Sequence, residues 1–140
     1  MSGWLLDTNI ISELRKPRSE PKVISFVASA PLDDLYVSIV TLAEIRFGIE
    51  SVKDTAKRSE LSDWLEHKVT PLFARRVLGV SEDVMLRWRL LVEEGRKAGY
   101  TYSQPDLIIA ATALVHDLAV VTRDTVEFRR ARAPVFNPWQ

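Results

Sequence analysis

Four acidic side chains stand where apolar segments of this sequence begin or end. Asp7 follows the run "WLL", and Asp124 lies just after "LAVVT". Glu44 lies one turn into the apolar segment "TLAEIRFG", and Asp106 lies in the first turn of "QPDLIIAA". Because four carboxylates gathered in one pocket would repel one another strongly, such a cluster makes chemical sense if it holds a cation.

The residue types narrow the choice of cation and of reaction. Oxygen ligands without His or Cys suit Mg²⁺ or Mn²⁺ and not zinc, and the chain contains no Cys. His67 and His116 lack the spacing of a zinc motif. Since a protein-bound Mg²⁺ can activate a water molecule and neutralise a phosphoryl oxygen, the four acids point to hydrolysis of a phosphodiester bond.

Each of these acids also has a purely structural explanation. Asp7 and Asp124 could cap the helices that follow them, and Thr41 with Glu44 fits the T-x-x-E capping box, which residues 103–106 imitate. Capping does not explain why two acids follow apolar strands. Both interpretations therefore stay open from the pattern alone.

The elements that must position these acids alternate along the chain. We expect short strands at about 3–6, 35–38, within 74–80, at 118–122 and at 133–137. We expect helices at about 8–15, 21–30, 41–51, 54–69, 81–99, 103–117 and 125–132. Alternation of this kind predicts an α/β fold with a mostly parallel sheet covered on both faces. Ligands bind beyond the carboxyl ends of such strands, where Asp7 and Asp124 would share one edge.

Length and composition indicate one domain, residues 1–140. With 46% hydrophobic residues, the chain can bury a real core. No secretory signal is visible, and the longest apolar stretch, "LIIAATALV", is far shorter than the roughly 20 residues that cross a bilayer. We therefore expect a cytoplasmic protein without a membrane partner. The formal net charge is zero, which gives no overall attraction to nucleic acid, although clustered acids would leave the remaining surface net basic.

Four segments of the sequence resemble the PIN-domain nucleases, and among them the VapC-type toxins of bacterial and archaeal toxin–antitoxin pairs. They are "LLDTNIISEL", "VTLAEIRFGI", "PDLIIAATAL" and "VVTRDTVEF", in the order and spacing of that family. The Asp directly after "TR" is most similar to the FitB-like branch. The resemblance implies a PIN-like α/β/α sandwich and a metal-dependent endoribonuclease.

The resemblance also assigns roles to individual residues. The acidic residues of the family correspond to Asp7, Glu44, Asp106 and Asp124. Asn9 would orient Asp7 through a hydrogen bond, and Thr122 would support the site near Asp124. Many relatives have Asn where Asp124 stands and Asp at the position of Glu127. We expect Asp124 to contribute most at this end of the site and Glu127 not to be a direct metal ligand.

Basic and aromatic residues surround these acids in the sequence. The arginines at this end are Arg123, Arg129, Arg130 and Arg132. They could form a solvated face, but they also flank the proposed site, so Arg123, Arg129 and Arg130 are candidate contacts for RNA phosphates. Tyr100 and Tyr102 lie just before Asp106 and are candidates for substrate contact. The residues Trp64, Trp88 and Trp139 are expected in the core or an interface, and neither His is expected to be catalytic.

The resemblance implies partners as well as a substrate. A small antitoxin that binds DNA would send a C-terminal segment across the acidic site, so the chain would meet DNA only through that antitoxin. We expect a basic residue of the antitoxin near Asp7, Glu44 and Asp106, and a heterotetramer or larger assembly. A homodimer is also expected, formed through apolar residues of two helices: Phe26, Val27, Leu61, Trp64 and Leu65.

Two rival functions stay open. The chain could be a non-catalytic partner module of a DNA-binding regulatory complex, although its full set of acids argues against lost catalysis. It could also be another metal-dependent phosphohydrolase, such as a phosphatase. Those enzymes usually carry an Asp nucleophile in a D-x-D pattern, whereas Asp7 is followed by Thr8 and Asn9.

Overall fold

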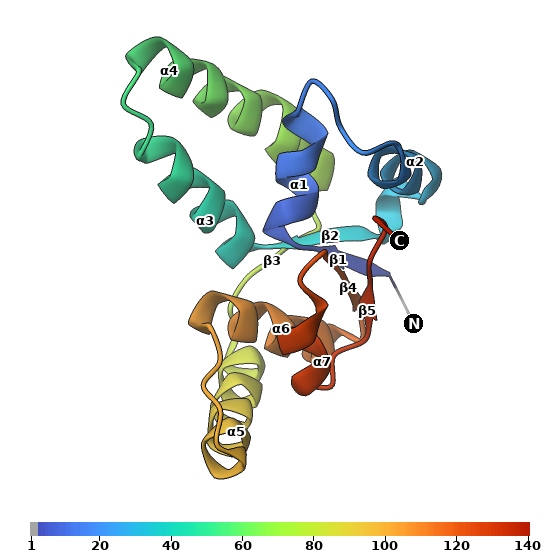
Figure 1. Ribbon diagram of the computed structural model, residues 1–140, viewed down its shortest axis with the longest axis vertical. Coiled ribbons are helices and arrows are strands. Elements are labelled where there is room, and N and C mark those ends of the chain that lie inside the picture. The colour runs from blue at the N-terminus through green and yellow to red at the C-terminus, as the bar shows by residue number, and fades with distance from the viewer. Residues whose placement is uncertain (1–2) are drawn as a thin grey trace.

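A parallel five-stranded sheet forms the centre of the molecule (Figure 1). The computed structural model describes residues 3–140. The strands are β1 (Trp4–Leu6), β2 (Leu35–Ser38), β3 (Val77–Leu78), β4 (Ala119–Val121) and β5 (Val135–Phe136). Their order is β3-β2-β1-β4-β5, and each neighbouring pair runs parallel. β1 and β4, which precede two of the candidate acids, therefore lie side by side.

Helices cover both faces of this sheet. They are α1 (Thr8–Arg15), α2 (Pro21–Ser29), α3 (Ile39–Glu50), α4 (Thr55–Trp64), α5 (Glu82–Ala98), α6 (Gln104–His116) and α7 (Thr125–Arg130). In Figure 1, α1, α3 and α4 lie on one side of the sheet, and α5, α6 and α7 lie on the other. The predicted α/β/α sandwich with a parallel sheet is confirmed. None of the helices within residues 3–140 has the length and apolar character needed to cross a membrane.

Alternation along the two central strands divides the core in two. Leu5 and Val120 belong to the cluster that contains α5 and α6 residues, whereas Leu6 and Val121 belong to the cluster on the α1 and α3 side. All four side chains are fully buried, because a central strand of a covered sheet has no solvent face. The carboxyl ends of β1 and β4 are thereby held rigidly.

The apolar residues expected to face a second copy are used by the chain's own core. Leu61 and Leu65 are buried, and Phe26, Val27 and Trp64 are partly buried against the same cluster. Leu61 and Leu65 are therefore not available to a second copy, whereas a homodimer through the partly exposed residues of α2 and α4 stays a prediction.

Helix ends follow the predicted signals in one case and depart from them in another. Ser81 accepts from the Val84 amide at 3.2 Å, and Gly99 ends α5 with a left-handed φ of 87°, both as predicted. The helix expected from residue 41 begins at Ile39, because the Ser38 hydroxyl accepts from the Val40 amide at 3.0 Å. Thr41 and Glu44 therefore do not form a capping box.

The predicted helix 54–69 changes its winding instead of ending before Pro71. Regular α-helix stops at Trp64, a π-helical segment covers Leu65–Val69, and a 3-10 turn covers Thr70–Phe73. The buried side chains here recur every four residues, at Leu61, Leu65, Val69 and Phe73. These four side chains continue one buried face through the change of winding.

Candidate functional site

The first acid is fixed by the pairing of the two central strands. Leu6 of β1 pairs with Val121 of β4, and the Asp7 amide donates to the Val121 carbonyl at 3.0 Å. Asp7 is only 4% exposed. Its Oδ1 accepts from the Thr8 amide at 2.8 Å, which makes Asp7 the cap of α1. Capping and a functional role thus coincide in this residue.

Thr122 is the hub of the hydrogen bonds around Asp7. Its hydroxyl donates to Asp7 Oδ2 at 2.8 Å and accepts from Asn9 Nδ2 at 3.2 Å and from the Asp124 amide at 3.0 Å. Thr122 is fully buried, so no water competes for these bonds. Asn9 was expected to bond to Asp7, but it bonds to Thr122 instead and supports Asp7 through it. Its Oδ1 also accepts from the Arg123 amide at 3.3 Å.

Opposing effects act on the pKa of the Asp7 carboxyl group. Burial raises the pKa of its carboxyl group, and the negative charge of Asp124 raises it further. The hydrogen bonds from Thr122 and from the Thr8 amide act in the opposite direction. The net effect is a raised pKa, which means that the folded chain disfavours the carboxylate form unless further positive charge is supplied.

The pKa of Asp106 is also raised. Asp106 is the third residue of α6, where no side chain caps the helix. Its pKa is raised to about 7, and burial is the largest cause. The further causes, in decreasing order, are the charges of Asp7 and Glu127, a hydrogen bond to Glu127 and the charge of Asp124. Carboxyl groups from α7 and from the ends of β1 and β4 therefore contribute to the raised pKa of Asp106.

Glu127, which is not expected to be a direct metal ligand, lies next to this cluster. It lies on α7 and accepts from the Ser103 amide at 3.2 and 3.3 Å, which ties α7 to the start of α6. The same side chain hydrogen-bonds to Asp106. A signal was present in the sequence, since Glu127 follows Asp124 by three residues and such pairs share one face of a helix.

Glu44 lies on α3, the helix that directly follows β2. Its side chain is exposed on the second turn of α3, and among residues 3–140 no hydrogen bond or ion pair links it to Asp7, Asp106 or Asp124. The described part of the chain also has no group of three or more His, Asp and Glu side chains positioned as ligands of one metal ion. Asp7, Asp124 and Glu127 thus act electrostatically on Asp106, while the convergence of Asp7, Glu44, Asp106 and Asp124 on one metal ion stays a prediction.

The donor set nevertheless fits a hard divalent cation in its chemistry. Its side chains offer only carboxylate and hydroxyl oxygens, the donors that Mg²⁺ and Mn²⁺ prefer. The buried Asp7 and the half-buried Asp106 both have raised pKa values, chiefly through burial and in part because other carboxylates lie nearby. A cation placed among these groups would reverse that effect.

The candidate RNA-binding arginines differ in their surroundings. The guanidinium of Arg123 lies over the Trp139 ring at 5.0 Å, and that of Arg130 lies over the Tyr100 ring at 4.9 Å. Arg129 is exposed without such a contact, and Arg132 pairs with Glu94 at 2.6 Å. Only two of the arginines are thus held over aromatic rings.

The aromatic and histidine side chains lie mostly where they were expected. The residues Trp64, Trp88 and Trp139 are partly buried against the core clusters. Tyr102 is buried and Tyr100 is half-buried, so of the two only Tyr100 is placed to meet a substrate. His67 and His116 are exposed, and neither is a neighbour of the acids.

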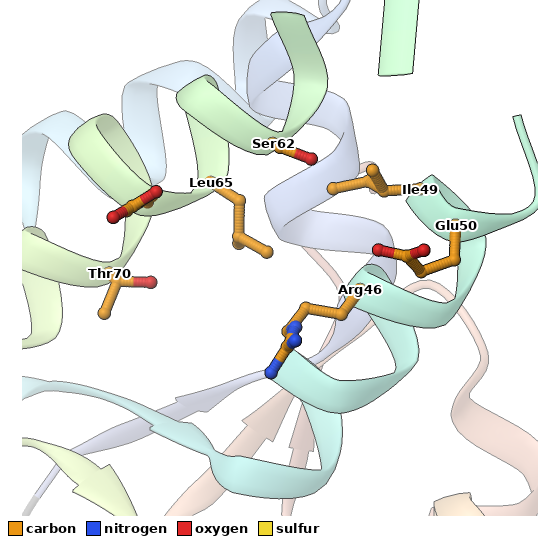
Figure 2. Close-up of a pocket in the computed structure, with 7 residues that line it drawn as sticks. Arg46, Ile49, Glu50, Ser62, Leu65 and Thr70 are labelled. Carbon is orange, nitrogen blue, oxygen red and sulfur yellow. The ribbon is translucent and has the colours of Figure 1, made fainter. Parts of the chain in front are cut away.

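A separate hollow of about 380 Å³ lies between α3 and the helical segment that begins with α4 (Figure 2). It is lined by Arg46, Ile49, Glu50, Ser62, Leu65, Glu66 and Thr70. In Figure 2 Arg46 and Glu50 approach it from α3, and Leu65 points into it from the other side. The candidate acids do not line this hollow, so it is distinct from the carboxylate cluster.

Comparisons with known proteins agree with this architecture. Residues 4–134 match the PIN domain family. The chain is 39% identical over 135 residues to the toxin FitB of Neisseria gonorrhoeae, covering 96% of this chain and 97% of FitB. It is 35% identical over 136 residues to a VapC ribonuclease of Sinorhizobium fredii, covering 97% of each.

Solved structures give the same result. The crystal structure of FitAcB from Neisseria gonorrhoeae matches with a TM-score of 0.92 at 39% identity, over 98% of this chain and 99% of that one. FitAB bound to a DNA fragment matches with a TM-score of 0.91 at 37% identity, over 98% and 96%. A toxin–antitoxin complex from Klebsiella pneumoniae matches with a TM-score of 0.68 at 26% identity, over 97% and 98%.

Proposed function

The chain belongs to the PIN domain family, and from this premise we propose that it is a VapC-type toxin that hydrolyses RNA phosphodiester bonds. The relatives that match it over nearly their whole length are named a toxin and a VapC ribonuclease. The observation that carries the proposal is the cluster of carboxyl groups at the carboxyl ends of β1 and β4, in which Asp7, Asp124 and Glu127 all raise the pKa of Asp106.

The proposed cofactor is Mg²⁺ or Mn²⁺. Asp7, Asp106 and Asp124 would hold it, with Glu127 beside Asp106, and Glu44 would join from α3. When bound, the ion supplies an activated water and neutralises charge on the phosphate. Its preference for oxygen ligands is met by these side chains.

The chain's own residues prepare this site in defined ways. Thr122 and the Thr8 amide fix both oxygens of the Asp7 carboxylate, so that Asp7 presents one orientation to the substrate. Asp106 and Glu127 share a hydrogen bond, and Asp106 is only partly ionised near neutral pH because its pKa is about 7. Burial of Asp7 and Thr122 excludes water from behind the cluster.

The proposed protein partner is a DNA-binding antitoxin. Assemblies described as FitAB bound to a DNA fragment and as a toxin–antitoxin complex support it. The antitoxin's C-terminal segment would cover the acids with an Arg or Lys, and a carboxylate cluster offers that side chain paired hydrogen bonds. The hollow of Figure 2, which combines Arg46 and Glu50 with apolar Ile49 and Leu65, would take further residues of the same segment. A homodimer, assembled with antitoxin into a heterotetramer or larger complex, is proposed on the same basis.

The test of the proposed function is RNA cleavage by purified chain under metal control. End-labelled RNA is incubated with the chain after chelation and again after addition of Mg²⁺ or Mn²⁺. We expect cleavage only with metal, and a loss of about 100-fold or more in Asp7→Asn, since the amide keeps the shape of the carboxylate but not its charge. Asp63→Asn, an exposed acid on α4, is the matched control. Cleavage that persists in excess chelator would contradict the proposal.

The inhibitory contact needs its own experiment. The basic residue at the end of the antitoxin is replaced by Ala, and RNA cleavage by the complex is measured. We expect the complex to cut RNA while still assembled. If it stays assembled and silent, inhibition does not work through the acids, and a chain that binds DNA with its partner but never cuts RNA would favour the non-catalytic module.

A further inference from the structure

Two arginines near the carboxylate cluster are held in place by aromatic rings. Arg123 directly follows Thr122, and its guanidinium lies 5.0 Å from the centre of the Trp139 ring. Arg130 is on α7, three residues after Glu127, and its guanidinium lies 4.9 Å from the centre of the Tyr100 ring. Both contacts have the geometry of cation–π stacking. The two side chains are thus oriented without the help of a carboxylate.

No ion pair within residues 3–140 neutralises the guanidinium of Arg123. The pKa of Glu13 is lowered first by the Glu20 amide and then by Lys16, and Arg123 makes the smallest contribution. Glu13 already forms an ion pair with Lys16 at 3.0 Å and accepts from the Glu20 amide at 2.8 Å. Among residues 3–140, Arg123 takes part in no direct ion pair, so its donors are available to a ligand.

The Tyr100 ring beneath Arg130 is supported by Tyr102, which packs against Gly95. Gly95 of α5 has no side chain, and a Cβ there would lie 3.0 Å from the Tyr102 ring. Tyr102 fills that space, meets Tyr100 edge to face at 5.1 Å and 84°, and donates to its hydroxyl at 3.2 Å. Tyr100 in turn supports Arg130. The ring under this arginine is therefore fixed by packing and is not a loose surface group.

Both arginines border the cluster on different sides. The Arg123 amide donates to Asn9, which places it toward α1, whereas Tyr100 belongs to the loop before α6, close to Ser103 and Glu127. The other arginines of this region lack such support: Arg129 has no ring beneath it, and Arg132 is paired with Glu94. The positive charge is thus concentrated at two prepared points.

We propose that Trp139 and Tyr100 are positioning residues that hold Arg123 and Arg130 as a two-point phosphate clamp for single-stranded RNA. The inference rests on the proposed function. Stacking covers one face of each guanidinium and leaves the N–H groups on its edge directed outward, where they match two phosphate oxygens. The RNA backbone passes over the carboxylates, with one phosphate held toward α1 and another toward the loop before α6. An ammonium group could carry the same charge but not the same fork of donors.

The test measures RNA binding without cleavage. Asp7→Asn serves as parent, the probe is a fluorescein-labelled single-stranded RNA of mixed sequence, and the dissociation constant is determined by anisotropy over a range of KCl concentrations. In this parent, Trp139→Leu and Tyr100→Leu keep every charge but remove a ring. We expect each to weaken binding about 3- to 10-fold and to lower the salt slope by about 0.7, the value for one lost phosphate contact on a single strand. Trp139→Phe and Tyr100→Phe keep a ring and should restore both quantities.

Lysine variants give an independent arm that does not disturb the rings. Arg123→Lys and Arg130→Lys should weaken binding, whereas Arg129→Lys should have a smaller effect. Arg75→Lys, an exposed arginine before β3 and away from the carboxyl ends of the strands, is the matched control. Circular dichroism and melting temperature verify that each variant is folded.

The outcomes separate this inference from the function on which it rests. If the parent binds RNA but the Leu variants keep its affinity and salt slope, the rings do not position the arginines and the inference is overturned. It is equally overturned if Arg129→Lys weakens binding as much as the other two. If the parent itself binds no single-stranded RNA, the proposed function fails, and the clamp fails with it.

Discussion

The hydroxyl of Thr122 donates to Asp7 Oδ2 over 2.8 Å, although the two residues are 115 positions apart in the sequence. The bond joins the residue after β4 to the residue after β1. Because the same hydroxyl also accepts from Asn9 and from the Asp124 amide, a single buried side chain couples the three polar segments of the site.

Thr122→Val should therefore weaken both stability and activity. Valine keeps the shape but leaves Asp7 Oδ2 and two donors without their partner, at a cost of about 1–3 kcal/mol. The pKa of Asp7 should rise further, because Thr122 lowers it, and the acid limb of the cleavage profile should move to higher pH. Urea unfolding and a pH–rate profile measure the two effects.

The control for this change is Thr112→Val. Thr112 is also fully buried, and its hydroxyl donates to the Ile108 carbonyl at 2.8 Å, within α6. We expect this variant to lose about 1 kcal/mol of stability and to keep its pH profile. Equal profiles in the two variants would show that the Thr122 bond does not tune Asp7.

Glu127→Gln should change the ionisation of its neighbour. Removal of the Glu127 charge takes away one of the causes that raise the pKa of Asp106 to about 7, so this pKa should fall. NMR titration of the Asp106 carboxyl measures the change directly. RNA cleavage should fall about 10-fold or more if Glu127 belongs to the site. An unchanged pKa of Asp106 would separate the two side chains.

Asp106→Asn should stabilise the metal-free chain at neutral and alkaline pH. The folded pKa of about 7 lies above the ordinary 3.8, so the ionised form is disfavoured in the folded state. The resulting penalty is absent below about pH 4, grows between about 4 and 7, and is complete above 7. At pH 8 the variant should melt about 3 °C or more above the parent chain, and at pH 4 the two should coincide. A difference independent of pH would contradict the assignment.

Divalent metal should reverse this order of stability. A ligand that binds only the folded state raises its stability in proportion to the logarithm of ligand concentration. Mg²⁺ or Mn²⁺ should raise the melting temperature of the parent chain and raise that of Asp106→Asn much less. Differential scanning fluorimetry at pH 8 measures both, with Asp63→Asn as a control expected to respond like the parent. An equal response of all three would place the metal elsewhere.

The fold was largely accessible from sequence because its signals are local. Apolar runs, Ser81 and Gly99 define strands and helix ends through neighbouring residues alone. The change of winding at residues 65–73 was not predicted from the sequence, because the four-residue spacing of the buried Leu65, Val69 and Phe73 also fits a regular α-helix. The burial of Leu61 and Leu65 in the chain's own core was not predicted either, because an apolar pattern does not say which surface covers it.

The site was accessible in part. Strand ends and family motifs pointed to Asp7, Asp106 and Asp124, and the structure brings these three into electrostatic contact. The position of Glu127 depends on how α7 docks against the start of α6, which no local pattern encodes. The indirect role of Asn9, through Thr122, depends on a donor and acceptor pairing between segments more than 100 residues apart.

The strand order also determines at what point during synthesis of the chain the site can form. β1 is made first, yet its neighbours β2 and β4 come from far along the chain, and β4 with α7 is among the last segments to leave the ribosome. At about 5–20 residues per second, a nascent chain holds Asp7 for several seconds without Thr122, Asp124 or Glu127. The carboxylates cannot act together in that interval. Translation thus imposes a delay between the synthesis of Asp7 and the assembly of the complete carboxylate cluster, and during that delay α3 and α4 are already made.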